Sequence, residues 1–322
     1  MRLPCRALCL ILIVLLAGCA AKSGQRSQAL SPEEAKARFQ QGEASYQSGM
    51  YHHSHEAFIS TEAAGYQPMA SLVNAGASLL AMRQSTQALP MLERATREPT
   101  ATATAWYNYG LALYGAGRFD EAAKALQQSI QLEPENADAW TALGAAFMGK
   151  RLPGLAIDQF TRALALAPDN PTILADRAGA YLDATLYKEA HRDYQAVLAL
   201  GDLTTGHMGL GEVYLEQKQC RPAEEHFTKA VELSPGNSLA YYNLGLVHRQ
   251  CGNLDKAVED FTRAAAFDPD FSEALVMRGD THLVLRKVDL GCKDLEEACK
   301  MGNCARLDVV REAGLCPRFP RL

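Results

Sequence analysis

Cysteine and histidine are the residues of this chain whose chemistry is most specific. Nine cysteines are present, and six lie in the C-terminal third, at Cys220, Cys251, Cys292, Cys299, Cys304 and Cys316. An even number of cysteines in an exported chain indicates disulfide bonds. A four-cysteine zinc site is the alternative, but the spacings contain no paired C-x-x-C motif. For His52, His53 and His55 we predict a solvated turn rather than a metal site, because no cysteine or acidic partner has matching spacing.

The N-terminus carries the features of an export signal. Arg2 and Arg6 are followed by an apolar run, residues 8–16, which is too short to span a bilayer. The run ends in Leu16-Ala17-Gly18-Cys19, which resembles a bacterial lipobox. That resemblance implies cleavage before Cys19, lipidation (palmitate among the acyl chains) on Cys19, and an anchor on the periplasmic face of the outer membrane, since Ala20 follows. An ordinary secretory signal or an uncleaved anchor is the alternative.

Charge argues against a nucleic-acid partner. Loss of Arg2 and Arg6 with the leader leaves 30 of the 32 basic residues against 37 acidic ones, a formal net charge of −7. No basic patch with interleaved aromatic residues is present. We therefore expect no nucleic-acid binding, and we attribute the acidic balance to solubility.

A repeat of about 34 residues must position whatever chemistry the chain has. One small residue recurs at spacings of 34 residues, with a single spacing of 33, at Gly42, Gly76, Gly110, Gly144, Ala178, Gly211, Gly245 and Gly279. A period of this size indicates stacked helical units that cover one another's apolar faces. The repeats leave no segment of domain length, and no C-x-x-C-H, G-x-x-x-x-G-K-[ST] or G-x-S-x-G motif occurs. We therefore predict a protein that is not an enzyme, without cofactor or metal.

The residues around each glycine resemble the tetratricopeptide repeat. With Ala137 as position 1, the fourth unit has Trp140, Leu143-Gly144, Phe147, Ala156, Phe160 and Pro168 at the positions typical of that family. The resemblance implies an all-α, right-handed α-solenoid of about eight helix pairs. Its units start near residues 35, 69, 103, 137, 171, 204, 238 and 272.

The repeat phase also divides the chain. Residues 1–18 are the predicted leader, and residues 19–30 are the acylated cysteine and a flexible tether. Ser31, Pro32 and Glu34 form a helix start, so the solenoid covers residues 31–305. Residues 306–322 are predicted to form a capping helix and a tail.

The same phase favours particular disulfides. If residues 288–300 form the last second helix, Cys292 and Cys299 lie on one face of it. A capping helix that returns antiparallel then brings Cys304 beside Cys299 and Cys316 beside Cys292. Cys220 and Cys251 both fall at an inter-helix turn of adjacent units, which allows a third bridge. Six cysteines permit fifteen pairings, so the sequence leaves the connectivity open.

The resemblance to the family also implies a binding site. In that family the first helix of each unit lines a concave groove, and asparagines at position 6 can hold a peptide backbone. Here Asn74, Asn108 and Asn243 occupy position 6, but the series is interrupted in four other units. The predicted groove residues are Tyr46, Asn74, Leu80, Tyr107, Asn108, Leu111, Tyr114, Met148, Leu182, Met208, Leu215, Tyr242, Asn243, Leu246 and Arg249. Some of these side chains could instead pack against the adjacent unit.

These features predict a non-catalytic, lipid-anchored scaffold of the cell envelope. Its groove is expected to bind an envelope protein or peptide, as in pilus, secretin or outer-membrane assembly. Two alternatives remain: an adaptor that recruits peptidoglycan-acting enzymes, and a non-enzymatic subunit of a secretion or glycosyl-transfer complex. The sequence leaves the oligomeric state open.

Overall fold

The computed structural model describes residues 30–316, and every regular element in that range is a helix. The helices form two compact units, one ending at Arg118 and the other beginning at Phe119. This boundary lies between α6 and α7, which the repeat phase assigns to one repeat. All-helical architecture with consecutive helices packed in pairs confirms the predicted α-solenoid fold.

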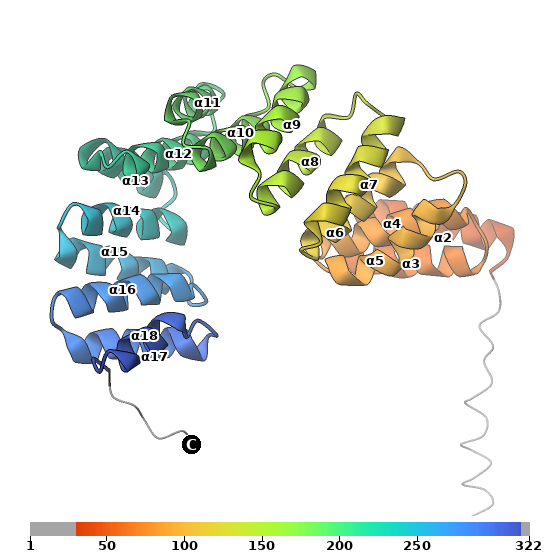
Figure 1. Cartoon of the computed structure of the whole chain (residues 1–322). Coiled ribbons are helices and arrows are strands. Elements are labelled where there is room, and N and C mark those ends of the chain that lie inside the picture. Colours follow the sequence, from red (N-terminus) through yellow and green to blue (C-terminus); the bar gives the residue numbers. More distant parts are fainter. Residues whose placement is uncertain (1–29, 317–322) are drawn as a thin grey trace, which may run out of the picture. The chain divides into compact units, whose positions relative to one another are not determined.

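The first unit contains five helices, each packed against its neighbours in sequence (Figure 1). They are α2 (Pro32–Gln47), α3 (Tyr51–Ala63), α4 (Pro68–Ala81), α5 (Ser85–Arg97) and α6 (Ala103–Gly115).

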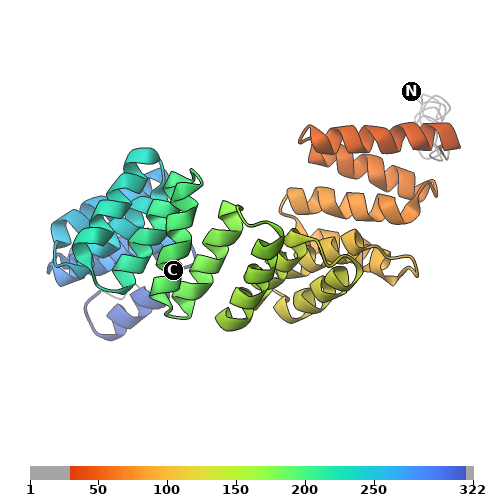
Figure 2. The ribbon, with the colours of Figure 1, turned by 90° about the horizontal axis from the view of Figure 1, so that it is seen from above.

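The second unit contains twelve helices, and Figure 2 shows from above how successive helices of this unit run side by side. They are α7 (Phe119–Leu132), α8 (Ala137–Gly149), α9 (Pro153–Leu166), α10 (Pro171–Asp183), α11 (Tyr187–Ala199), α12 (Leu203–Glu216), α13 (Cys220–Leu233), α14 (Ser238–Gln250), α15 (Leu254–Phe267), α16 (Ser272–Val284), α17 (Val288–Lys300) and α18 (Ala305–Glu312).

Local residue types explain where the helices begin and how each pair turns. The expected capping box is present at α2, where Glu34 N donates to Ser31 Oγ and Ser31 N donates to Glu34 Oε2. Between the two helices of every repeat of about 34 residues, the residue at position 15 adopts a left-handed backbone conformation. Glycine tolerates this conformation at Gly117 and Gly252, whereas Thr185 adopts it despite its branched Cβ.

The periodic glycine exists because a large side chain from the second helix lies against its backbone. A Cβ on Gly144 would lie 2.6 Å from Phe160 Cε1, and a Cβ on Gly245 would lie 2.7 Å from Phe261 Cε1. Both phenylalanines are almost completely buried. The recurring Gly and Phe are therefore two halves of one packing contact, which fixes how closely the helices of a pair approach.

Repeats that have arginine instead of leucine at position 7 use a different contact between their two helices. Arg177 donates through Nε and Nη2 to both carboxylate oxygens of the buried Asp193, at 2.7 and 2.9 Å, and through Nη1 to Thr161 of the preceding unit. Arg278 makes the same bidentate pair with Asp294. The fifth and eighth repeats thus replace an apolar contact with a charge-assisted one.

Disulfide bonds and a short helix close the C-terminal end. Cys292 is bonded to Cys316, Cys299 to Cys304, and Cys220 to Cys251, the three pairs that the repeat phase favours. Their sulfurs are consequently not available as thiolate ligands for zinc. The buried side chains of Leu307 and Val310 pack α18 onto α17 beside the Cys292–Cys316 bond. This helix covers an apolar face that would otherwise meet water.

Candidate binding groove

Within the second compact unit, a groove of about 500 Å³ is lined by α12, α14 and α16, each the first helix of its repeat, and by the start of α15. All of its lining residues belong to this unit. Three leucines and a valine provide apolar surface, and one acidic, one basic and one amide side chain surround it. The lining residues are Leu215, Glu216, Leu246, Arg249, Gln250, Leu254 and Val284. An apolar lining with a few polar groups is typical of sites that bind another molecule.

The helical period of α14 explains which side chains reach this groove. Leu244 and Val247 are buried in the core beside Phe227, whereas Leu246 and Arg249 are only half-buried. These two residues are three positions apart and lie on the same face of the helix. The core contacts of one face therefore orient the opposite face of α14 toward the groove.

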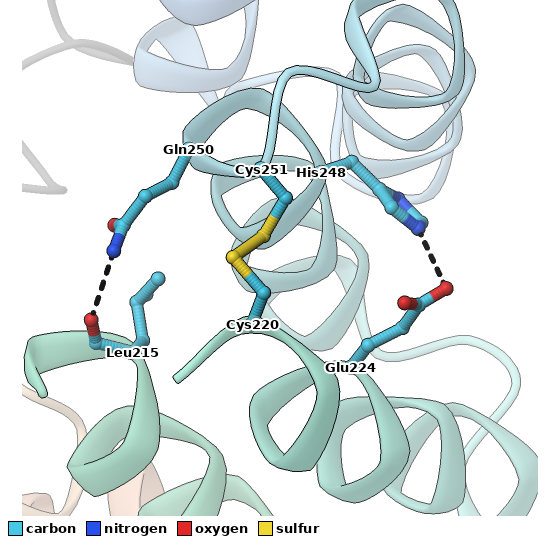
Figure 3. Close-up of a disulfide and its surroundings, with 6 residues drawn as sticks. All are labelled: Leu215, Cys220, Glu224, His248, Gln250 and Cys251. Atoms are coloured by element: carbon cyan, nitrogen blue, oxygen red, sulfur yellow. Dashed lines mark hydrogen bonds and ion pairs between the residues drawn. A yellow bond between two sulfur atoms is a disulfide. The ribbon is translucent and has the colours of Figure 1, made fainter. Parts of the chain in front are cut away.

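A covalent bond and two polar contacts fix the helices that form the groove wall. The Cys220–Cys251 disulfide joins the start of α13 to the end of α14. Figure 3 shows it between two further contacts: Gln250 Nε2 donates to the Leu215 carbonyl at 3.2 Å, and His248 Nε2 lies 3.0 Å from Glu224 Oε1. Because Leu215 and Gln250 both line the groove, these contacts hold its two sides in register.

Behind the groove, His248 connects three helices. Its Nδ1 lies 2.6 Å from the buried carboxylate of Asp260 on α15, while Nε2 faces Glu224 on α13. Burial raises the pKa of Asp260, and the hydrogen bond with His248 opposes that rise. The network satisfies polar groups that the core would otherwise leave unpaired.

The structure distributes the predicted groove residues of the second unit over three environments. Leu215, Leu246 and Arg249 line the groove. Met148, Leu182 and Tyr242 are half-buried, and each also packs on a core cluster. Met208 and Asn243 are buried, and Asn243 Nδ2 donates to Glu212 Oε1 at 3.3 Å. The amide of Asn243 is therefore engaged by its own chain.

In the first unit, the predicted residues lie on α2, α4 and α6. Tyr46 and Tyr114 are each 39% exposed, which leaves ring surface for a partner. Asn108 is buried, so it offers little surface. The remaining four are half-buried: Asn74, Leu80, Tyr107 and Leu111.

Four lining residues were not among the predicted groove residues. Glu216, Gln250 and Val284 all occupy position 13, and this shared position is the signal that would have identified them. Leu254 begins α15, the second helix of its unit. Its place in the groove depends on the turn at Gly252, which the repeat pattern does not describe.

Two other predictions concern the N-terminal part of the chain. Cys19 and residues 1–18 lie outside the described residues. The solvated turn predicted at His52, His53 and His55 is wrong: all three lie in helix α3, and His55 Nδ1 is 3.2 Å from the Ala75 carbonyl oxygen. Between residues 30 and 316, no group of three or more potential ligands is arranged to hold a metal ion. In the same range, no helix is long and apolar enough to cross a membrane.

Comparison with protein families finds the tetratricopeptide repeat along most of the helical region. Models of this repeat match residues 73–130, 110–171, 176–238 and 238–271. Among curated proteins, human Tetratricopeptide repeat protein 13 is 27% identical over 175 residues, which are 53% of this chain and 20% of that protein. Anaphase-promoting complex subunit 3 of Schizosaccharomyces pombe is 28% identical over 89 residues, 28% of this chain and 13% of that protein. The chain thus aligns with a fifth or less of these relatives.

Solved structures share the fold. A tetratricopeptide repeat protein from Parabacteroides merdae gives a TM-score of 0.65 at 16% identity, covering 76% of this chain and 97% of its own. A chain of the APC/C hetero-tetramer Cut9-Hcn1 gives 0.60 at 16% identity, covering 80% and 52%. Pseudomonas aeruginosa pilF gives 0.52 at 19% identity, covering 66% and 97%.

Proposed function

This chain belongs to the tetratricopeptide repeat family, and on that basis we propose that it binds a segment of another cell-envelope protein in the groove of α12, α14 and α16. Members of the family are protein-interaction scaffolds and are generally not catalysts. The groove, lined by three leucines, a valine and three polar side chains, is the observation that carries the proposal.

The groove is suited to this task because its walls are already fixed. The Cys220–Cys251 bond and the Gln250–Leu215 hydrogen bond order α12, α13 and α14 before any partner arrives. A preorganised site loses less conformational entropy on binding than a mobile one. The apolar floor suits the side chains of an extended segment or an amphipathic helix.

We also propose that the scaffold is lipid-anchored through Cys19 at the periplasmic face of the outer membrane. The support is the sequence Leu16-Ala17-Gly18-Cys19 and the aperiodic, polar residues that follow it. A tether of this composition would leave the helical units free to meet a partner in the envelope. Envelope assembly remains our preferred role, ahead of recruitment of peptidoglycan-acting enzymes.

Substitution of one groove leucine tests the binding surface. Leu246→Asp replaces an apolar side chain of the groove lining with a hydrated carboxylate, and we expect it to weaken partner binding about tenfold or more, because the apolar contact is lost and the carboxylate must lose water on binding. The measurement is co-purification of cross-linked neighbours with the full-length chain, quantified by mass spectrometry. Pilus, secretin or outer-membrane components would identify the preferred role, and wall enzymes would identify the alternative.

A matched control separates the groove from general effects of the substitution. Leu233→Asp changes an exposed leucine on the second helix α13 in the same way. It should leave partner recovery unchanged, and circular dichroism should show both variants fully helical. Equal recovery with Leu246→Asp and the wild type would place the binding surface elsewhere.

A further inference from the structure

Four carboxylates lie on two adjacent first helices beside the groove. Asp176 and Asp183 are two helical turns apart on α10, and Glu212 and Glu216 are one turn apart on α12, so each pair shares a helix face. Among the described residues, no ion pair or hydrogen bond engages Asp176, Asp183 or Glu216. Asp176, Asp183 and Glu216 are exposed, so water screens part of their mutual repulsion, and a bound cation would relieve the remainder.

A buried tyrosine points its hydroxyl group into this set of carboxylates. Tyr194, on α11, occupies the position that holds phenylalanine in four other units, and it is only 6% exposed. Its ring contacts the backbone of Gly209 on α12 so closely that a Cβ there would overlap it. Its hydroxyl oxygen continues toward α10, 3.9 Å from where a Cβ on Gly179 would lie. The ring therefore passes between the two helices that carry the four carboxylates.

Within residues 30–316 no group is hydrogen-bonded to the Tyr194 hydroxyl, and its oxygen is not fully enclosed, so a ligand can reach it from outside although the ring is buried. The pKa of Tyr194 is raised, mainly by burial and next by the negative charges of Glu212, Asp176 and Asp183. The hydroxyl is therefore within electrostatic reach of carboxylates on both helices. A fifth carboxylate nearby, Asp193, is already neutralised by Arg177.

Glu212 is the most enclosed of the four carboxylates. Burial raises its pKa, the hydrogen bond from Asn243 lowers it, and the charge of Glu216 raises it again. A single amide donor compensates only part of the lost hydration of this carboxylate. An added cation would complete the compensation.

The arrangement favours an organic cation over a metal ion. Within the described residues, no three of these groups are close enough together to coordinate a metal. Lysine and arginine side chains are long, and their apolar stems could lie along Leu182 and Leu215 while the charged group reaches the carboxylates. Glu216 belongs both to this set and to the lining of the groove, which makes the two surfaces continuous.

We propose that Asp176, Asp183, Glu212, Glu216 and the Tyr194 hydroxyl form a subsite for a lysine or arginine side chain of the segment bound in the groove. The partner is accordingly a protein with a basic segment. This inference rests on the proposed function, because it assigns the chemistry of the partner at the same face.

Fluorescence anisotropy with two synthetic peptides tests the subsite on the full-length chain. One labelled peptide alternates alanine and lysine, and the other has glutamine in place of lysine. At low ionic strength we expect the lysine peptide to bind about tenfold more tightly. Asp183→Asn with Glu216→Gln should remove most of that difference. Tyr194→Phe should weaken the lysine peptide about threefold, since it removes one hydrogen-bonding group and keeps the ring.

The matched control is Asp158→Asn with Glu232→Gln, which removes the same charge from exposed positions on the second helices α9 and α13. It should change affinity less than about twofold. Equal losses in the control and the subsite variant would reduce the effect to general attraction and overturn the proposal. Wild-type affinity in Tyr194→Phe or in the subsite variant would also contradict it. So would a calcium or zinc site that Asp183→Asn abolishes.

Capture of the native partner separates this inference from the proposed function. If Leu246→Asp abolishes capture while Asp183→Asn with Glu216→Gln leaves it intact, the groove stands and the basic subsite fails. If Leu246→Asp leaves capture intact, the proposed function itself fails.

Discussion

Single side chains at positions 7 and 23 join the two helices of a repeat by a charge pair in the fifth and eighth repeats. The Arg177–Asp193 pair is nearly enclosed, with side-chain exposures of 19% and 6%, and Thr161 of the preceding unit extends it. Charge pairs of this kind stabilise less than their geometry implies, because both ions lose hydration. Substitution of only one member of the pair, however, leaves the other as a buried charge without a partner.

We therefore expect Asp193→Ala to lower the free energy of unfolding by about 3 kcal/mol, because Arg177 stays buried and unpaired. The fourth unit suggests a compensated replacement, since Leu143 and Gln159 occupy the same two positions there. Arg177→Leu with Asp193→Gln should lose no more than about 1.5 kcal/mol. Urea unfolding followed by circular dichroism measures both values. A double variant as unstable as Asp193→Ala would contradict this account.

A second residue-scale effect depends on pH. His226 Nδ1 lies 2.9 Å from His207 Nδ1, and its ring stacks on Tyr214. Burial, then the charges of His207 and Lys229, lower the pKa of His226 to about 4 from the ordinary 6.5. The unfolded chain therefore binds a proton between these values while the folded chain does not. Stability must fall as pH decreases through that window, and the loss ends near the folded pKa.

Comparison of urea midpoints at neutral pH and near pH 5 tests this linkage. His226→Gln, which copies Gln159 of the fourth unit, should show a smaller decrease than the wild type. His207 should retain part of the effect, because burial lowers its pKa as well. An unchanged difference between the two pH values would exclude His226 as a source.

At the scale of elements, the recurring glycine sets the distance between paired helices. Gly245→Ala would bring a methyl group against the buried ring of Phe261, so we expect a loss of about 1–3 kcal/mol in the free energy of unfolding. Gly154→Ala makes the same chemical change in the first turn of α9, where a Cβ meets nothing within 4 Å. That variant should be neutral or gain up to about 1 kcal/mol. Thermal unfolding of both variants decides whether packing or backbone entropy dominates.

Elements also differ in how much the sequence reveals about them. The helix pairs could be predicted because each apolar face repeats with the helical period and each unit contacts mainly its neighbours. The same phase favoured the three cysteine pairs that form, since it places Cys292 and Cys299 on one helix face, but the connectivity stayed open until the structure showed it. His52, His53 and His55 were misassigned to a turn because the polar composition of this segment resembles a turn, while Phe58 and Ala57 bury the opposite face of α3.

At the scale of the whole molecule, the helices form two compact units, and inside each unit a helix contacts mainly the helices next to it in sequence. Stability in such stacks is the sum of local terms, so no single core holds the chain together. The proposed lipid on Cys19 would connect these units to a membrane without a spanning helix.

Cys19→Ala tests the anchor. We expect the wild-type chain to sediment with the membrane fraction and to carry acyl chains, whereas the variant lacks the acylated sulfur and should carry none, although it keeps its apolar leader because the cleavage site is lost. Mass spectrometry of the wild-type N-terminal peptide should show acyl chains on the cysteine. An unmodified cysteine in the wild-type chain would remove the lipid anchor from the proposal.

The sequence by itself determined the helical repeat, its phase and the identity of the core positions, because the Gly–Phe contact and the helix period depend on residues within one unit and its neighbours. Only the tertiary structure decided which candidate groove residues are open. Met208, Asn108 and Asn243 are buried while Leu246 and Arg249 line a groove, because exposure depends on the size and direction of side chains from adjacent units. For the same reason, the direction of the Tyr194 hydroxyl depends on Gly209 and Gly179, which lie on two other helices.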